Sequence, residues 1–399
     1  MTLRPLLLLA LSVALPLCAR AQVPERTIDE IKAESIARAE RGAYPLGGLD
    51  PKDVAEALSL IRTRDRDEWA QAWSSVAQRY DDEGTRATSA SAAAAAFKRA
   101  WRLFYLAQWP VPNSPGKRAA YERALDAYAR YGRTLDPPLE TVRIPFEGGT
   151  ITAYLRLPNA SAGPVPVILT ISGLDSRKET VAESYGQILS QGVGFIAVDG
   201  PGTGQAPLKA SPTADRMFSA VLDHLAQNPR VDRSRVIVSG VSFGGYWAAK
   251  LAITERARLL GAVVQSPPVD EVFSEHFLRE STLGNREYLF DLAPAFLSVF
   301  DGAPTIDDLA RTLPAMSLRQ MGLLGRPTTP MLVVAGVKDT QVPIADIELL
   351  LRSGDVPKEA WINPRGGHLG REPRGWTDPA IFSKVIVPWE LRLIEQSRH

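Results

Sequence analysis

The sequence predicts an α/β protein: a mostly parallel, doubly wound sheet preceded by a domain of helices. Three observations predict it. Over residues 27–131, apolar and aromatic side chains recur three and four positions apart, as they do on one face of a helix. From residue 165 onward, short continuous apolar runs alternate with helical stretches, which is typical of parallel strands covered on both faces. Between residues 267 and 326 this alternation stops, so we expect a cap insertion there, with an ordinary connecting excursion as the alternative.

Residues 1–21 have the pattern of an export signal. Arg4 supplies one positive charge, Leu6–Leu17 is an apolar core, and Ala19 and Ala21 are the small residues before the cut. A membrane-spanning helix needs roughly 20 apolar residues, so a retained membrane anchor is the alternative that we do not favour. We therefore expect a periplasmic or secreted protein with no membrane attachment after cleavage. Cleavage would remove Cys18, the only cysteine, and with it any disulfide, cysteine nucleophile or thiolate metal site.

Residues 22–136 are expected to form the helical domain. Three stripes of aromatic and apolar residues have helical spacing: Trp69, Trp73, Val76 and Tyr80; Trp101, Tyr105 and Trp109; Tyr121, Leu125 and Tyr128. We interpret these stripes as core and not as a ligand cage. Asp50–Pro51 is a typical helix start with proline in the first turn. Pro137–Pro138 then marks the boundary to the second domain, residues 137–399.

The second domain is predicted to contain the sheet. Residues 141–146 and 151–157 alternate like two strands joined around Gly148–Gly149. Buried strands are expected at residues 165–171, 194–198, 235–239, 262–265 and 330–335, and helices at residues 181–191, 214–227 and 381–396. This alternation of strands and helices predicts that the later strands run parallel.

The charge pattern limits the classes of ligand. The chain carries 46 basic and 45 acidic side chains, and they are interspersed instead of gathered into blocks. This composition argues against a nucleic-acid-binding surface. The glycine-rich turn Asp199–Gly204 lacks the lysine of a phosphate-binding P-loop, and we interpret it as a turn that shapes a pocket wall. We expect a small-molecule substrate and neither a cofactor nor a metal.

Ser242 is the predicted nucleophile. It lies in Gly240–Gly245 (GVSFGG), between an apolar strand and the start of a helix. A strand that turns abruptly into a helix strains the backbone at the turn, and glycines two residues either side leave room for it. This geometry would hold the serine hydroxyl exposed above the edge of the sheet.

A serine hydroxyl becomes a good nucleophile only when an imidazole accepts its proton. The chain has four histidines. His224 lies in a predicted helix before the serine, His276 lies in the expected cap, and His399 is the last residue. The remaining one, His368, lies in the glycine-rich segment Arg365–Gly370 after a short strand, so we expect it to be the base.

The imidazole needs an acid that accepts its other NH and fixes the tautomer. Asp339 follows the apolar run Met331–Val337 and gives the chain order serine, acid, histidine. Asp346 and Asp355 lie nearby, but the first falls on a predicted helix and the second in a later turn. We therefore favour Asp339.

Acyl chemistry also needs donors that face the developing oxyanion. The residue after the nucleophile supplies one of them, which here is the backbone NH of Phe243. The second is expected from the loop Ser172–Asp175 after an earlier strand. We choose the NH of Leu174, with that of Asp175 as the near alternative.

Several segments together resemble one branch of the α/β-hydrolases: Gly173–Glu179, Asp199–Gly204, Val231–Asp232 and Gly240–Tyr246. That branch contains the fermentation-respiration-switch-like esterases and dihydroxypseudooxynicotine hydrolase, whose members carry a helical region before the catalytic domain. The resemblance implies the α/β-hydrolase fold and the same triad, Ser242, Asp339 and His368. It also implies a pocket partly roofed by the N-terminal helices, and a homodimer through those helices would be in keeping with it.

The branch includes ester hydrolases and enzymes that cleave a carbon–carbon bond beside a ketone. Some of these relatives use an extra acid from the cap, for which the candidates here are Asp270, Glu271 and Glu275. Our leading hypothesis is ester hydrolysis through an acyl-enzyme on Ser242. Carbon–carbon hydrolysis of a diketone-like compound comes next, followed by an aminopeptidase-like activity. A non-catalytic binding protein that keeps the fold is the hypothesis from a different class.

Overall fold

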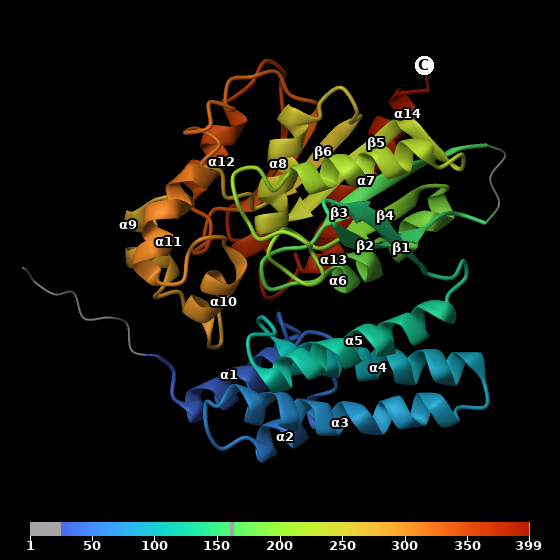
Figure 1. Ribbon diagram of the computed structural model, residues 1–399, viewed down its shortest axis with the longest axis vertical. Helices are drawn as coiled ribbons and strands as arrows, with labels where there is room; N and C mark the ends of the chain where they lie inside the picture. The colour runs from blue at the N-terminus through green and yellow to red at the C-terminus, as the bar shows by residue number, and fades with distance from the viewer. Residues whose placement is uncertain (1–24, 160–162, 399) are drawn as a thin grey trace, which may run out of the picture.

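The structure, a computed structural model, describes residues 25–159 and 163–398. Figure 1 shows two parts: a layer of helices in blue to teal, and an α/β part whose sheet lies between helices. The expected signal peptide at residues 1–21 and His399 lie outside the described residues. Within those ranges, no helix is both long and apolar enough to cross a membrane.

The N-terminal layer follows from amphipathic helices with well-defined starts. Its helices are α1 (Ile28–Arg41), α2 (Pro51–Leu60), α3 (Arg66–Arg86), α4 (Ala90–Gln108) and α5 (Pro115–Arg133). The predicted start of α2 is confirmed, since the Asp50 carboxylate accepts the NH of Lys52 and Pro51 takes the first position. The predicted aromatic stripes are core: Trp69, Trp73, Trp101 and Tyr128 are all buried.

The sheet contains eight strands in the order β1-β2-β4-β3-β5-β6-β7-β8. They are β1 (Glu140–Phe146), β2 (Gly149–Arg156), β3 (Val165–Ile171), β4 (Gly194–Val198), β5 (Val231–Val241), β6 (Gly261–Gln265), β7 (Met331–Gly336) and β8 (Glu359–Asn363). The pairs β1–β2 and β2–β4 are antiparallel, and every later pair is parallel. The central strands β3, β4, β6 and β7 are buried along their whole length, as their continuous apolar sequences predict.

Both faces of the sheet are covered. The helices of this part are α6 (Lys178–Tyr185), α7 (Arg216–Gln227), α8 (Phe243–Thr254), α12 (Ile344–Leu351), α13 (Asp378–Ile381) and α14 (Val387–Gln396). Because successive side chains of a strand point to opposite faces, Val167 and Leu169 join the core formed with α7 and α8. Ile168, between them, joins the core formed with α6, α14 and the N-terminal helices. The N-terminal layer and the sheet therefore share one hydrophobic core.

The segment between β6 and β7 contains the short helices α9 (Glu275–Phe277), α10 (Leu292–Val299) and α11 (Ile306–Thr312). It corresponds to the insertion expected at residues 267–326 and is drawn in orange in Figure 1. Below, this segment is called the cap.

Candidate active site

Ser242 lies at the turn from β5 into α8, where its backbone takes the left-handed φ of 53°. Its NH donates to the carbonyl of Gln265 at 2.8 Å, which holds the turn against β6. A Cβ atom at Gly240 would overlap the carbonyl of Gly244, and one at Gly244 would overlap that of Ile171. The flanking glycines are therefore a steric requirement of this turn, for the reason that the sequence suggested.

Asp339 and His368 form a buried pair on neighbouring loops. The Nδ1 atom of His368 lies 2.9 Å from one carboxylate oxygen of Asp339 and 3.1 Å from the other. The same carboxylate accepts the backbone NH groups of Gln341 and Val342, each at 2.9 Å. Burial alone would raise the pKa of Asp339, but the neighbouring His368 and these hydrogen bonds outweigh it and hold the pKa below its usual value. The carboxylate is thus ionised, which leaves Nε2 of the imidazole as the basic nitrogen.

Gln265 connects the serine turn to the histidine loop. Its carbonyl accepts the NH of Ser242, and its side-chain Nε2 donates to the carbonyl of Leu369 at 2.8 Å. The NH of Leu369 in turn donates to the hydroxyl of Ser266 at 2.9 Å. Among the described residues no hydrogen bond joins the Ser242 hydroxyl to His368; in sites without substrate this bond is often long.

Ser242 opens into a narrow cavity of about 50 Å³ beneath the cap. Most of its walls are aromatic or aliphatic. The lining residues are Leu174, Ser242, Phe243, Pro268, Val272, Phe273, Thr282, Asn285, Tyr288, Leu292, Phe296, Phe300, Leu313, Gln341 and Val342. None of the lining residues carries a charge, so the space beside the serine favours an uncharged group.

The two residues expected to bind the oxyanion line this same cavity. Leu174 lies in the loop after β3, and a Cβ atom at the preceding Gly173 would lie 3.5 Å from the Cβ of Ser242. The loop therefore passes directly over the serine. Neither the NH of Leu174 nor that of Phe243 donates to another group in the part of the chain that the structure describes. Asp175, the alternative donor, does not line the cavity.

The other acidic residues considered as the triad acid or as an extra acid from the cap lie away from the cavity. Asp346 accepts the backbone NH groups at the start of the cap, those of residues 269–271. Asp355 accepts the NH of Thr328. The cap candidates Asp270, Glu271 and Glu275 do not line the cavity. Asp270 instead accepts the hydroxyl of Ser317 and pairs with Arg319.

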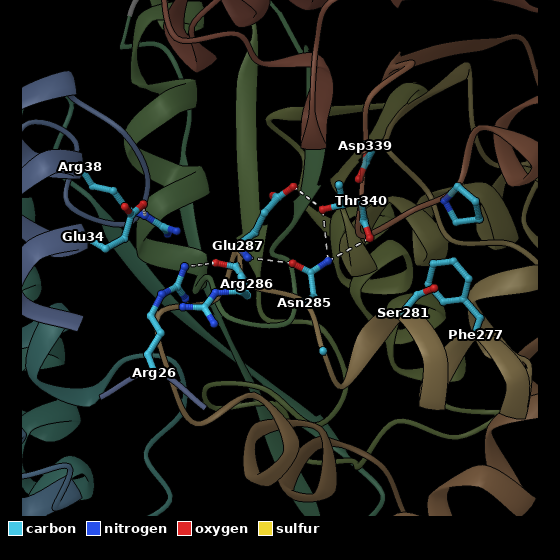
Figure 2. A pocket seen from close by; sticks show the side chains of 12 residues that line it. Arg26, Glu34, Arg38, Phe277, Ser281, Asn285, Arg286, Glu287, Asp339 and Thr340 are labelled. Atoms are coloured by element: carbon cyan, nitrogen blue, oxygen red, sulfur yellow. Dashed lines mark hydrogen bonds and ion pairs between the residues drawn. The ribbon is translucent and has the colours of Figure 1, made fainter. Parts of the chain in front are cut away.

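An open groove of about 760 Å³ adjoins the cavity, since Asn285 lines both. Figure 2 shows Arg26, Glu34 and Arg38 of the N-terminal part on one side of it, and the cap on the other. The cap is fastened to the loop after Asp339 by short polar contacts. Asn285 Nδ2 donates to the carbonyl of Thr340 at 2.9 Å. Glu287 accepts the hydroxyl of Thr340 at 2.5 Å and the amide of Gln341 at 2.8 Å.

The resemblance implied a pocket partly roofed by the N-terminal helices; residues of the N-terminal part line the outer groove, while the cavity at Ser242 is lined by other segments. One expectation about the pocket walls needs correction: the turn Asp199–Gly204 does not line the cavity. Gly202 packs so closely on the carbonyl of Val299 in α10 that a Cβ atom there would overlap it, so the turn supports the cap from outside.

The sequence did not point to the residues that hold the proposed site together. The Gln265 side chain bonds across 104 positions of sequence and Asn285 bonds to Thr340 across 55, and no local pattern identifies these residues. In the described ranges no cluster of three or more histidine, cysteine or acidic side chains is arranged to hold a metal.

The chain is similar in sequence to known hydrolases. The family model described as Esterase FrsA-like matches residues 55–363. Hydrolyase poxO of Penicillium oxalicum is 31% identical over 246 residues, which cover 57% of this chain and 58% of that protein. Esterase FrsA of Yersinia pestis is 24% identical over 327 residues, 77% of this chain and 78% of that one. The chain thus spans less than two thirds of the length of the first of these relatives.

Among solved structures, that of 2,6-dihydroxy-pseudo-oxynicotine hydrolase superposes with a TM-score of 0.73 at 21% identity. The superposition covers 90% of this chain and 96% of that one, so the likeness includes the helical layer as well as the sheet. These findings confirm the fold predicted from the sequence and the family that it resembled. Because the family model covers more than half of its length, this chain belongs to the FrsA-like esterase family, a group of hydrolases with the α/β-hydrolase fold.

Proposed function

We propose that the protein is an exported serine hydrolase that cleaves small carboxylic esters through an acyl-enzyme on Ser242. One observation carries the proposal: Ser242, Leu174 and Phe243 line a single cavity, and the paired His368 and Asp339 lie on the adjoining loops. In our proposal the serine hydroxyl and the two backbone NH groups surround the position that an ester carbonyl would take.

The reaction follows from these groups. Asp339 accepts the Nδ1–H of His368, so that Nε2 can take the proton of Ser242 as its oxygen attacks the ester carbonyl. The NH groups of Leu174 and Phe243 stabilise the resulting oxyanion. When the intermediate collapses, the imidazolium returns the proton to the leaving alcohol. Water, activated by the same imidazole, then releases the acid and regenerates the serine.

The cavity favours an ester with an apolar acyl group. Four phenylalanines line it, and a ring or short alkyl chain would displace water from them: Phe243, Phe273, Phe296 and Phe300. The same lining argues against the two other hydrolytic activities. Carbon–carbon hydrolysis assisted by a cap acid, and recognition of a peptide's amino group, would each call for a carboxylate in the cavity wall, and no acidic residue of the described chain lines it.

The activity is tested with p-nitrophenyl acetate, butyrate and octanoate. We expect the wild type to prefer butyrate or octanoate and the Ser242→Ala variant to lose about 10³-fold or more of kcat. A fluorophosphonate probe should label the wild type and not the variant, while the exposed Ser234→Ala serves as a control. Full activity in Ser242→Ala, or faster cleavage of a 1,3-diketone than of any ester, would refute the proposal.

Export is proposed on the pattern of residues 1–21 alone, with the periplasm or the medium as the destination. Expression of the full chain in a bacterial host should yield a protein outside the cytoplasm. Its measured mass should be that of a chain whose first residue is Gln22. An uncleaved protein in the cytoplasmic fraction would contradict export.

A homodimer through the N-terminal helices is likewise proposed from the family. Sedimentation analysis, which measures the mass of the particle in solution, would test it.

A further inference from the structure

The loop that carries Leu174 is bound mainly by the N-terminal helices. The hydroxyl of Tyr105 in α4 donates to the carbonyl of Asp175 at 2.8 Å. Tyr44, in the connection between α1 and α2, reaches the same carbonyl at 3.3 Å, and the two hydroxyls lie 3.1 Å apart. Two phenols from the helical layer thus converge on the carbonyl of Asp175, the residue that follows Leu174.

Arg177 makes a second connection between the loop and the helical layer. Its side chain is fully buried, and it donates through Nη1 to the carbonyls of Ser176 at 2.7 Å and Leu174 at 3.3 Å. Through Nη2 it donates to Gln108 Oε1 at 3.1 Å and to the carbonyl of Pro110 at 2.9 Å. Gln108 is also fully buried. The guanidinium therefore ties the loop to the end of α4 with hydrogen bonds that water does not reach.

These contacts lie on both sides of the peptide that carries the NH of Leu174. On its N-terminal side, the NH of Gly173 donates to the hydroxyl of Ser176 at 2.7 Å. On its C-terminal side, the carbonyls of Leu174 and Asp175 are held by Arg177 and Tyr105. With the chain held on both sides, the segment that carries the NH of Leu174 cannot shift away from Ser242 without breaking these hydrogen bonds.

We infer that the N-terminal helical layer positions the oxyanion-binding NH of Leu174, with Tyr105 as the principal positioning residue and Arg177 with Gln108 as the second tie. The inference rests on the proposed function, because it requires Leu174 to bind the oxyanion. Oxyanion donors are effective when they are fixed before the reaction begins, and a displacement of about 1 Å can cost up to about 10²-fold in rate. The helices thereby contribute to catalysis although they do not line the cavity.

The test compares two phenol-to-phenyl changes in the full-length protein. Tyr105→Phe removes the hydroxyl that holds the loop. The control, Tyr121→Phe, removes a buried hydroxyl of the same layer that has no hydrogen-bond partner among the described residues. Because Tyr44 could partly replace Tyr105, the double variant Tyr44→Phe/Tyr105→Phe is measured as well. Each variant is assayed with p-nitrophenyl butyrate and titrated with n-butylboronic acid, which mimics the tetrahedral intermediate.

We expect Tyr105→Phe to lower kcat about 10-fold and the double variant to lower it further, with KM within about twofold of the wild type. Affinity for the boronate should fall in proportion to kcat. Tyr121→Phe should match the wild type in both measurements. A fall in kcat with an unchanged KM would show that the hydroxyl positions a transition-state donor. If the hydroxyl only stabilised the fold, its removal would lower Tm and leave kcat unchanged.

Three results would overturn the inference: unchanged kcat in the double variant, a rise in KM without a fall in kcat, or equal losses in Tyr105→Phe and Tyr121→Phe. If the wild type itself neither hydrolyses esters nor binds the boronate, the proposed function fails first and the inference falls with it. The wild-type measurement therefore separates the two failures.

Discussion

Asp339 determines which imidazole nitrogen of His368 carries the proton. Its carboxylate has only acceptor oxygens when ionised, so the nitrogen 2.9 Å away must be the N–H. The NH groups of Gln341 and Val342 hold the carboxylate in this orientation, and with His368 they keep its pKa low. Both charge and geometry thus select the tautomer in which Nε2 is free to accept a proton.

Replacement of Asp339 by asparagine tests this role. An amide can turn its NH₂ toward Nδ1, which would favour the tautomer with the proton on Nε2 and disable the base. We expect Asp339→Asn to lower kcat by on the order of 10³- to 10⁴-fold, as in other serine triads, with little change in Tm. Steady-state kinetics with p-nitrophenyl butyrate measures it, and Asp355→Asn, in a remote turn, is the control. A loss of less than about 10-fold would assign the acid's role to another residue.

The residues of the proposed site differ in how well the sequence identified them. Ser242 follows from local backbone chemistry, because the glycines around it are needed by the turn itself. His368 was reached by elimination among four histidines, and Asp339 by its position after a strand. Tyr105 and Arg177 could not be found in this way, since their bonds span 70 and 69 positions and depend on how the helices dock. Sequence patterns report neighbours within an element, not partners across the fold.

At the scale of elements, the cap is joined to the helical layer by a partly buried ion cluster. Asp291 begins α10, and its carboxylate accepts from Arg66 at 2.7 Å, from Asn113 at 2.9 Å and from Lys117 at 3.2 Å. Lys117 is fully buried. Burial lowers its pKa to about 8, with the charge of Asp291 opposing the shift. The cap is thus held over the cavity by electrostatic contacts to α3 and α5.

Removal of the Asp291 charge should weaken this attachment. Asn tolerates the left-handed φ of 65° at this position, so Asp291→Asn removes the charge with little backbone strain. Because it takes from the buried Lys117 the carboxylate with which it is paired, we expect a loss of about 3 kcal/mol in the free energy of unfolding. Urea denaturation measures it, with Asp301→Asn in the same cap as the control. When Asp291→Asn is made in the Lys117→Met variant, it should lower the free energy of unfolding much less. Equal losses in the wild type and in Lys117→Met would show that the two side chains do not interact.

The cap also shows where prediction of elements from sequence stops. Its helices α9, α10 and α11 have 3, 8 and 7 residues. Such segments are too short for a helical period to emerge from the sequence, and helices of this length are stabilised by tertiary packing. The 21-residue α3 and the 19-residue α5 were evident from their aromatic stripes for the opposite reason.

At the scale of the whole molecule, the two predicted domains differ in secondary structure but share a core. Tyr128 of α5 packs against Tyr154 of β2, with ring centroids 5.3 Å apart. The core that contains them continues through Ile168 of the sheet to Trp389 of α14. A helical layer joined in this way is not expected to move freely, which suits an element that positions the loop of Leu174.

This common core contains an unpaired acid. Glu390 of α14 is fully buried, and its Oε1 accepts the hydroxyl of Tyr185 at 2.7 Å. Its Oε2 has no hydrogen-bond partner in the described chain. Burial raises the pKa of Glu390 to about 8, although the bond from Tyr185 opposes the shift. The folded protein therefore keeps this carboxyl protonated at a pH where the unfolded chain would release the proton.

The stability of the whole molecule should reflect this proton. An exposed glutamate titrates near pH 4.3, so between about pH 4 and pH 8 the folded state binds more protons at this position than the unfolded state. Its contribution to the free energy of unfolding is complete below that window and decreases as pH rises, by up to about 1.4 kcal/mol per pH unit. Glu390→Gln stays neutral, so its urea midpoint should fall less than that of the wild type between pH 5 and pH 8. Glu395→Gln, on the exposed side of the same helix, should follow the wild type, and an identical pH profile in Glu390→Gln would show that the buried carboxyl is charged after all.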